Sequence, residues 1–186
     1  AWVDRAAGLS AQHCAACHQP GSMKGVATRY PRVVDGKVVN LEAKLRHNGP
    51  RLAYESQELL ALTAYVATQP RGKPIAVEPH QPHLHAGRAS FHRRQGQLNL
   101  ACAHCHDDNW GKQLAGNPIP QAHPPGYPIY RLEWQSVGSL TRRFRNCLTG
   151  MRAEQYPQGA PELVELELYL MWRARGMPLE SPAVRP

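Results

Sequence analysis

The sequence has few aromatic side chains and no long apolar run. Only 7% of its 186 residues are aromatic and just two are phenylalanine, although 42% are hydrophobic. A chain of this length forms one or two compact domains, and so few aromatic side chains leave a purely protein-built core short of bulk. No stretch approaches the run of about 18 apolar residues that a membrane-spanning helix needs. We therefore expect no transmembrane helix.

A concentrated block of basic residues is also absent, although the net charge is +8. The lysines and arginines are scattered and no aromatic residues alternate with them, which argues against a nucleic-acid-binding protein. Small anions and membrane surfaces remain compatible with this charge.

The opening residues, Ala1–Arg5, do not resemble a signal peptide. We expect the mature form of an exported protein.

Four of the five cysteines fall into two C-x-x-C-H motifs. The motif residues are Cys14, Cys17 and His18 in the first copy and Cys102, Cys105 and His106 in the second. This pattern is typical of covalent haem c attachment, in which two thiols bond to the haem and the histidine ligates its iron. A zinc ribbon would place its cysteine pairs about 15–20 residues apart, whereas 88 residues separate Cys14 from Cys102. Two disulfides are another alternative, but they would not explain why a histidine follows each cysteine pair.

The motifs predict two covalently bound haem c groups. Haem would supply the apolar bulk that the composition lacks. Covalent haem c attachment also indicates an oxidising compartment, so we expect a periplasmic protein.

The chain reads as a duplication. Glu58–Pro74 matches Glu162–Pro178 at an offset of 104 residues, and Tyr30–Pro31 matches Tyr127–Pro128 at an offset of 97. Each copy contains a haem motif, an irregular stretch and a closing amphipathic helix. We predict a mostly α fold of two tandem cytochrome c-type domains, spanning residues 1–76 (haem 1) and 77–186 (haem 2).

Local signals delimit the closing helices. Ser56 is the expected N-cap of the first, and Pro161 suits the first position of the second. Their apolar faces recur at helical spacing, through Leu59, Leu62 and Val66 and then Leu163, Leu166 and Leu170. Gly176 and Pro178 signal the end of the second helix. Dense proline predicts a linker at Pro70–Pro82 and an ordered loop at Asn117–Tyr130.

Cys147, outside both haem motifs, is the candidate distal ligand of haem 2. It is flanked in sequence by Arg142, Arg143, Arg145 and Arg152. Nearby arginines favour the thiolate, which ligates metals and attacks sulfur, and they suit a small oxyanion. The alternatives are an inert buried thiol and a solvated arginine face.

In the first copy the repeat points to residues 43–50, where His47 is the best candidate ligand, and we predict His18/His47 ligation for haem 1. Met23 and Lys44 are weaker candidates.

These segments together resemble SoxA, the catalytic subunit of the SoxAX thiosulfate-oxidising cytochromes (L-cysteine S-thiosulfotransferase). The resemblance is carried in the second half by Gly126–Leu140, Arg145–Cys147, Arg152–Glu154 and Gly176–Arg185, and in the first by Gly21–Ala27, Val39–Glu42 and Glu58–Val66. It spans nearly the whole chain and is most specific around Cys147.

The resemblance implies a role for individual residues. Cys147 matches the active-site cysteine of the family, a haem ligand typically found as a persulfide, and Arg143 and Arg173 match its active-site arginines. His106 matches the proximal ligand. The implied reaction joins thiosulfate to a cysteine of the carrier protein SoxYZ, and two electrons leave through the partner cytochrome SoxX. One departure is that diheme members usually carry a cysteine as distal ligand of haem 1, where this chain has His47 and Asn48.

Two other functions fit the same residues. A non-catalytic diheme electron carrier would use Cys147 only to tune its haem. A thiosulfate dehydrogenase would join two thiosulfates into tetrathionate.

Overall fold

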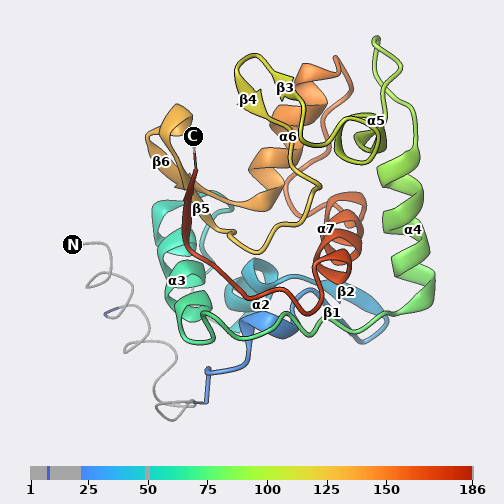
Figure 1. Ribbon diagram of the computed structural model, residues 1–186. Coiled ribbons are helices and arrows are strands. Elements are labelled where there is room, and N and C mark those ends of the chain that lie inside the picture. The colour runs from blue at the N-terminus through green and yellow to red at the C-terminus, as the bar shows by residue number, and fades with distance from the viewer. Residues whose placement is uncertain (1–7, 9–21, 49–50, 186) are drawn as a thin grey trace.

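The computed structural model describes residues 8, 22–48 and 51–185. The first haem motif, with Cys14, Cys17 and His18, lies outside these residues. The helices are η1 (Ala27–Arg29), α2 (Leu41–Asn48), α3 (Gln57–Thr68), α4 (Gln81–His92), α5 (Cys102–His106), η2 (Leu132–Trp134), α6 (Leu140–Gly150) and α7 (Pro161–Arg173). Helices dominate (Figure 1), which confirms the mostly α prediction. No helix in the described part of the chain is long and apolar enough to cross a bilayer.

The strands are short. They are β1 (Arg32–Val34), β2 (Lys37–Val39), β3 (Gln113–Leu114), β4 (Asn117–Pro118), β5 (Ile129–Arg131), β6 (Ser136–Gly138) and β7 (Ala183–Arg185). β1 pairs with β2 and β3 with β4 as antiparallel hairpins. β5 is the central strand of a small sheet, antiparallel to β6 and parallel to β7, in which Tyr130 pairs with both Val137 and Val184. This sheet thus joins β7, near the C-terminal end of the chain, to β5 and β6, and β6 leads directly into α6.

The local signals of the two closing helices are confirmed. The Ser56 hydroxyl accepts a hydrogen bond from the Leu59 backbone N–H at 3.2 Å, as an N-cap does. Pro161 is the first residue of α7, where its missing N–H leaves no donor unsatisfied. Gly176 follows α7 with a φ of +86°, a conformation that glycine adopts without steric cost.

Equivalent positions of the two repeats pair directly with each other. Pro74 and Pro178 form an antiparallel bridge. On either side of it, the Ile75 N–H donates to the Met177 carbonyl and the Leu179 N–H donates to the Lys73 carbonyl, each at 2.9 Å. The ends of the two repeats are therefore related by a local two-fold axis at this bridge. The matched Tyr–Pro bonds at Pro31 and Pro128 are both cis.

The predicted linker at Pro70–Pro82 is non-helical until α4 begins at Gln81, but part of it is buried. Ile75 and Val77 are 1% and 0% exposed. They belong to a core shared by both halves of the chain, which includes Tyr30, Leu41, Val66, Leu168, Met171 and Leu179. The segment is thus a structural part of the contact between the halves. The domain boundary at residues 76 and 77 stays a prediction.

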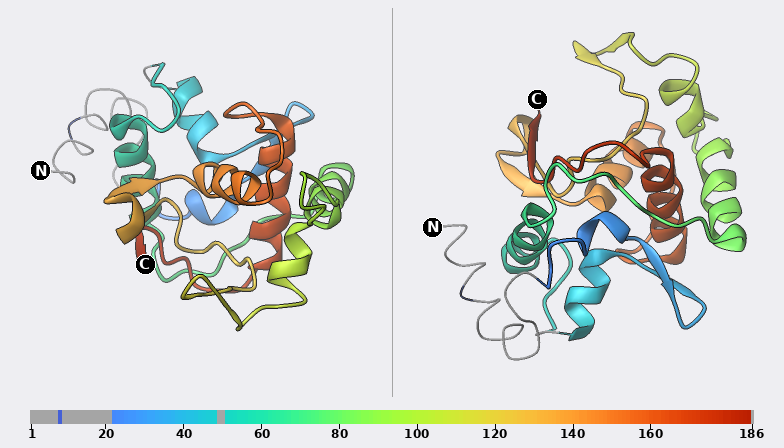
Figure 2. Two further views of the ribbon diagram at one scale, coloured as in Figure 1. Left: turned by 90° about the horizontal axis from the view of Figure 1, so that it is seen from above. Right: turned by 60° about the horizontal axis from the view of Figure 1, so that its bottom comes forward.

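A second core lies within the C-terminal half, where α4 crosses α7 (Figures 1 and 2). Gly87 permits the close approach, because a Cβ there would lie 2.1 Å from the Glu165 carbonyl oxygen. Phe91, one turn further along α4, is fully buried and its ring lies 5.6 Å from that of Tyr169. Together with α5 and α6, these two helices frame the large cavity described below.

The crossing at Gly87 gives a test of the fold. Gly87→Ala should lower the free energy of unfolding by about 1–3 kcal/mol, because the added methyl collides with a backbone carbonyl that cannot move aside without shifting α7. Gly150→Ala is the matched control, since nothing lies within 4 Å of a Cβ at that helical glycine. Denaturant unfolding of both variants measures the difference. Equal stability of the two would contradict the close crossing.

Candidate haem and thiol site

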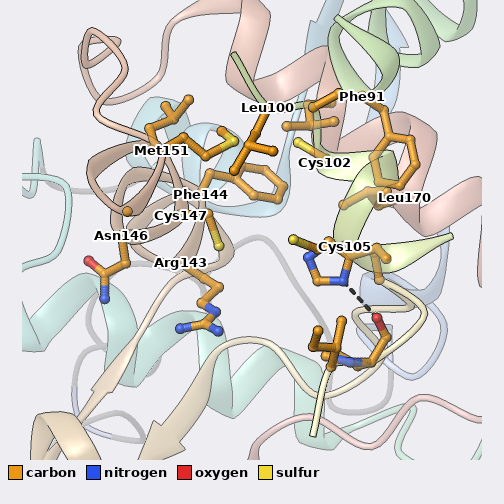
Figure 3. A pocket seen from close by; sticks show the side chains of 18 of the residues that line it. Phe91, Leu100, Cys102, Cys105, Arg143, Phe144, Asn146, Cys147, Met151 and Leu170 are labelled. Carbon is orange, nitrogen blue, oxygen red and sulfur yellow. Dashed lines mark hydrogen bonds between the residues drawn. The ribbon is translucent and has the colours of Figure 1, made fainter. Parts of the chain in front are cut away.

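The C-terminal half contains a cavity of about 380 Å³. α5 supplies one wall with Cys102, Cys105 and His106, and α6 supplies another with Cys147. In Figure 3 the Cys147 sulfur points across the cavity toward Cys105. The second haem motif and the candidate distal ligand, 41 residues apart in sequence, therefore face the same space.

Most of the remaining lining is apolar. It includes Phe91, Leu100, Phe144, Leu148, Leu163, Leu166 and Leu170. These side chains come from α4, α6, α7 and the segment that precedes α5, so the cavity forms only when all four pack together. The proline-rich segment that begins with β4 adds Pro118 and Pro120 to the lining, in agreement with the ordered loop predicted there.

His106 is held in the form that ligates a metal. Its Nδ1 lies 2.6 Å from the Pro120 carbonyl oxygen, the bond drawn as a dashed line in Figure 3. Nδ1 is thereby the protonated nitrogen, which leaves the lone pair of Nε2 for a metal. Burial lowers the pKa of His106 more than this hydrogen bond raises it. The neutral imidazole that iron requires is therefore favoured.

Haem c fits this cavity. The Cys102 and Cys105 thiols are free and line it, as thioether attachment requires. The wall beyond them is apolar, as a porphyrin face requires, and His106 presents an oriented imidazole. Cys102, Cys105 and His106 would hold the group, and Cys147 would face it from the opposite wall.

Arg143 and Cys147 lie one turn apart on α6, so both side chains reach the same side of the helix. The Ser139 hydroxyl caps this helix by accepting a hydrogen bond from the Arg142 N–H at 3.0 Å. Arg131 and Glu133 line the cavity as well. A Glu133 carboxylate oxygen lies 2.8 Å from Arg131 Nε and 3.5 Å from Arg143 Nη1. The thiol thus has two guanidinium groups beside it and one carboxylate bridging them.

The sequence predicts that these arginines favour the Cys147 thiolate. The environment that the protein itself provides contradicts this prediction. Burial raises the pKa of the Cys147 thiol, and the charges of Arg143 and Arg131 lower it by less. The cavity around the thiol is lined mostly by apolar side chains, and desolvation of the thiolate outweighs the attraction of two partly neutralised cations.

The other arginines near Cys147 in sequence point elsewhere. Arg142 lies over the Trp134 ring, with 4.4 Å from its guanidinium carbon to the ring centre. Arg145 donates to the Tyr156 carbonyl at 3.0 Å, and Arg152 is exposed. Arg143 is the member of the sequence cluster that faces the thiol.

The structure does not bring Arg173 into the cavity with Cys147. Its guanidinium lies 4.8 Å from the centre of the Phe91 ring and 2.7 Å from Asp107 Oδ1, next to His106. It lines a separate surface cavity with His85, Arg88 and His92. Its assignment as an active-site arginine stays a prediction.

The described residues do not decide which side chains ligate the iron of haem 1 in the first half of the chain. His47 is exposed in the last turn of α2, while its expected partner His18 lies outside the described residues. Met23 packs against the core shared by both halves, and Lys44 is half-buried.

Sequence reasoning missed Arg131 and Glu133. Both lie within the segment Gly126–Leu140 that carries the family resemblance, but no spacing relates them to Cys147. They reach the cavity because β5 pairs with β6, which leads directly into α6.

A family profile described as "SoxA/TsdA, cytochrome c domain" matches residues 1–75 and 86–179. The chain belongs to this family. It is therefore a c-type cytochrome with covalently bound haem c, and the resemblance noted from the sequence is confirmed. The two matched segments agree with two cytochrome c domains.

Two curated relatives named "L-cysteine S-thiosulfotransferase subunit SoxA" illustrate the similarity. The protein from Pseudaminobacter salicylatoxidans is 33% identical over 96% of this chain and 67% of its own length. That from Paracoccus pantotrophus is 31% identical over 97% of this chain and 66% of its own length. This chain thus spans about two thirds of these relatives. The crystal structure of SoxXA from P. pantotrophus superposes with a TM-score of 0.93 at 28% identity, covering 100% of this chain and 77% of that one.

Covalent attachment at the second motif can be tested by mass. The wild-type protein should carry two haems, and a Cys102→Ser, Cys105→Ser double variant should carry one, because serine forms no thioether with haem. Denaturing intact-mass spectrometry counts the groups that remain bound. A double variant that retains the wild-type mass of haem would contradict the assignment.

Proposed function

We propose that this chain is the catalytic subunit of a SoxA-type L-cysteine S-thiosulfotransferase. It would couple thiosulfate oxidatively to the cysteine of a SoxYZ-type carrier protein. The observation that carries the proposal is the Cys147 thiol, which lines the haem cavity beside the Arg143 guanidinium. The names of the relatives support the same activity.

The two guanidinium groups suit the charge and shape of thiosulfate. A sulfonate offers several oxygens, and an arginine donates two parallel hydrogen bonds to such a group. Arg143 and Arg131 would donate these hydrogen bonds, and Glu133 would hold their two guanidinium groups in place when no anion is bound.

Cys147 would relay sulfur by exchange of sulfur–sulfur bonds. The net reaction converts thiosulfate (S₂O₃²⁻) and a carrier thiol (R–SH) into R–S–S–SO₃⁻, one proton and two electrons. One sulfur–sulfur bond forms, and the thiol loses its proton. The haem, when bound, supplies the electron acceptor for this oxidation. A persulfide on Cys147, as the resemblance implies, would bring the reacting sulfur further into the cavity.

The proposed partners follow from the same family. A SoxX-type cytochrome would receive the electrons, which the likeness to a structure named SoxXA supports. Haem c attachment supports a periplasmic location, where a secreted carrier protein would be accessible.

The role of Cys147 gives the sharpest prediction. Cys147→Ala should retain covalent haem and a folded chain but lose at least about a hundredfold in thiosulfate-dependent turnover, because the group that exchanges sulfur is gone. Haem content, from a pyridine haemochrome spectrum, and cytochrome reduction with thiosulfate and carrier protein measure the two properties. Full turnover in this variant would refute the catalytic assignment.

Arg143→Gln should reduce kcat/KM for thiosulfate about ten- to hundredfold, because the charge-assisted hydrogen bonds of one guanidinium group to the dianion are lost. Arg143→Lys should recover only part of this loss, since lysine lacks the planar fork. Arg175→Gln, at an exposed arginine just after α7, is the control and should match the wild type. Steady-state kinetics over a range of thiosulfate concentrations compare the three. Equal values for Arg143→Gln and Arg175→Gln would remove Arg143 from the site.

A thiosulfate dehydrogenase is the second candidate, because the matched family profile covers both SoxA and TsdA. It would form tetrathionate from thiosulfate without a carrier protein. Product analysis with and without the carrier separates the two activities. A non-catalytic electron carrier would form neither product.

A further inference from the structure

Another, much smaller cavity lies between the two halves of the molecule. Its volume is about 50 Å³, which is enough for a water molecule. Tyr30, Glu42 and Thr63 line it from the first half, and Tyr127 and Glu167 line it from the second. It thus brings two carboxyl groups together in the interior, and the function proposed above uses neither.

Glu42 is a buried carboxylic acid on the wall of this cavity. The residue is 7% exposed. Burial and the nearby carboxyl groups of Glu167 and Glu55 raise its pKa well above the usual value, and Arg46 opposes them. A buried carboxylate in this position would be costly, so Glu42 is held in its neutral form.

Glu167 is the partner across the cavity. Its Oε2 accepts a hydrogen bond from Asn40 Nδ2 at 2.9 Å. Burial nevertheless raises the pKa of Glu167 to about 7. Glu55, the third carboxylate nearby, is engaged with the Ser139 N–H at 3.2 Å. Of the carboxyl groups here, Glu42 and Glu167 line the cavity and can exchange protons with a water inside it.

The ligand that fits this pair is a proton. Both carboxyl groups line one low-dielectric cavity, where burial disfavours the ionised form of each, so the site favours a bound proton. No group of three histidine, cysteine or acidic side chains in the described residues is arranged to hold a metal ion.

The small cavity lies one helix away from the haem cavity. α7 presents Glu167 to the small cavity and Leu163, Leu166 and Leu170 to the large one. An α-helix is about 10 Å across with its side chains, a separation at which interior charges still interact strongly. Tyr127 connects the two sites, because it lines the small cavity while the charges of Arg143, Arg131 and Cys147 reach its hydroxyl.

We propose that Glu42 and Glu167 form a redox-linked proton site, which binds a proton when the haem cavity gains an electron and releases it when the electron leaves. One electron and one proton enter together, so the net charge of the interior stays constant. The site would lower the electrostatic cost of holding an electron in the haem cavity. It is independent of the sulfur substrate, because any electron in the haem cavity has the same effect.

The test is the pH dependence of the haem reduction potential in the intact holoprotein, titrated spectroscopically between pH 5 and 9. In the wild type, the reduction equilibrium constant should change up to tenfold per pH unit around neutrality, which is about 59 mV for a one-electron couple. Glu167→Gln and Glu42→Gln, which keep the side-chain shape, should each flatten this dependence. Glu78→Gln, at an exposed carboxyl group, should leave it unchanged.

A second readout needs no variant. Reduction of the wild type in weakly buffered solution should take up protons, and the infrared difference spectrum should change in the carbonyl-stretching region of protonated carboxylic acids. A pH-independent potential in the wild type would overturn the proposal. So would a pH dependence that survives in both glutamine variants. Since dithionite can deliver the electrons, the result stands apart from whether thiosulfate is the substrate.

Discussion

The packing of α7 against both halves of the molecule is the contact on which the rest depends. Leu168 and Met171 join the core shared with the first half, while Leu163 and Leu166 join the core of the C-terminal half. The crossing at Gly87 fixes α4 against the same helix. Because α7 borders both cavities, its position determines the shape of the haem site and the separation of that site from the buried glutamates.

The chemistry at Cys147 reflects a competition between burial and charge. An exposed thiol beside two arginines would ionise easily, but the apolar wall that suits a porphyrin also disfavours the thiolate. Glu133 weakens the arginines further by bridging them. A dianionic substrate that displaced this carboxylate would bring in the negative charge that the two guanidinium groups lack. The protein environment therefore favours the neutral thiol beside a pair of cationic groups.

Much of the candidate site could be read from local spacing. The C-x-x-C-H motif, the one-turn separation of Arg143 and Cys147 and the caps of α3 and α7 all involve residues within a few positions of each other, where helical geometry is already determined. Arg131, Glu133 and the pair of Glu42 and Glu167 could not be found in this way. Their positions depend on strand pairing and on the contact between the halves, for which a single sequence contains no distance information.

The sequence by itself determined the cofactor class, the duplication and the helical elements, because these depend on motif spacing and on periodic burial along one segment. The tertiary structure decided which arginines face the thiol. It sent Arg142 to Trp134 and Arg173 to Asp107, and it brought Arg131 in from a strand. It also placed two glutamates, 125 residues apart, on one buried cavity. The physical reason is that burial and charge pairing between distant segments exist only once those segments have packed together.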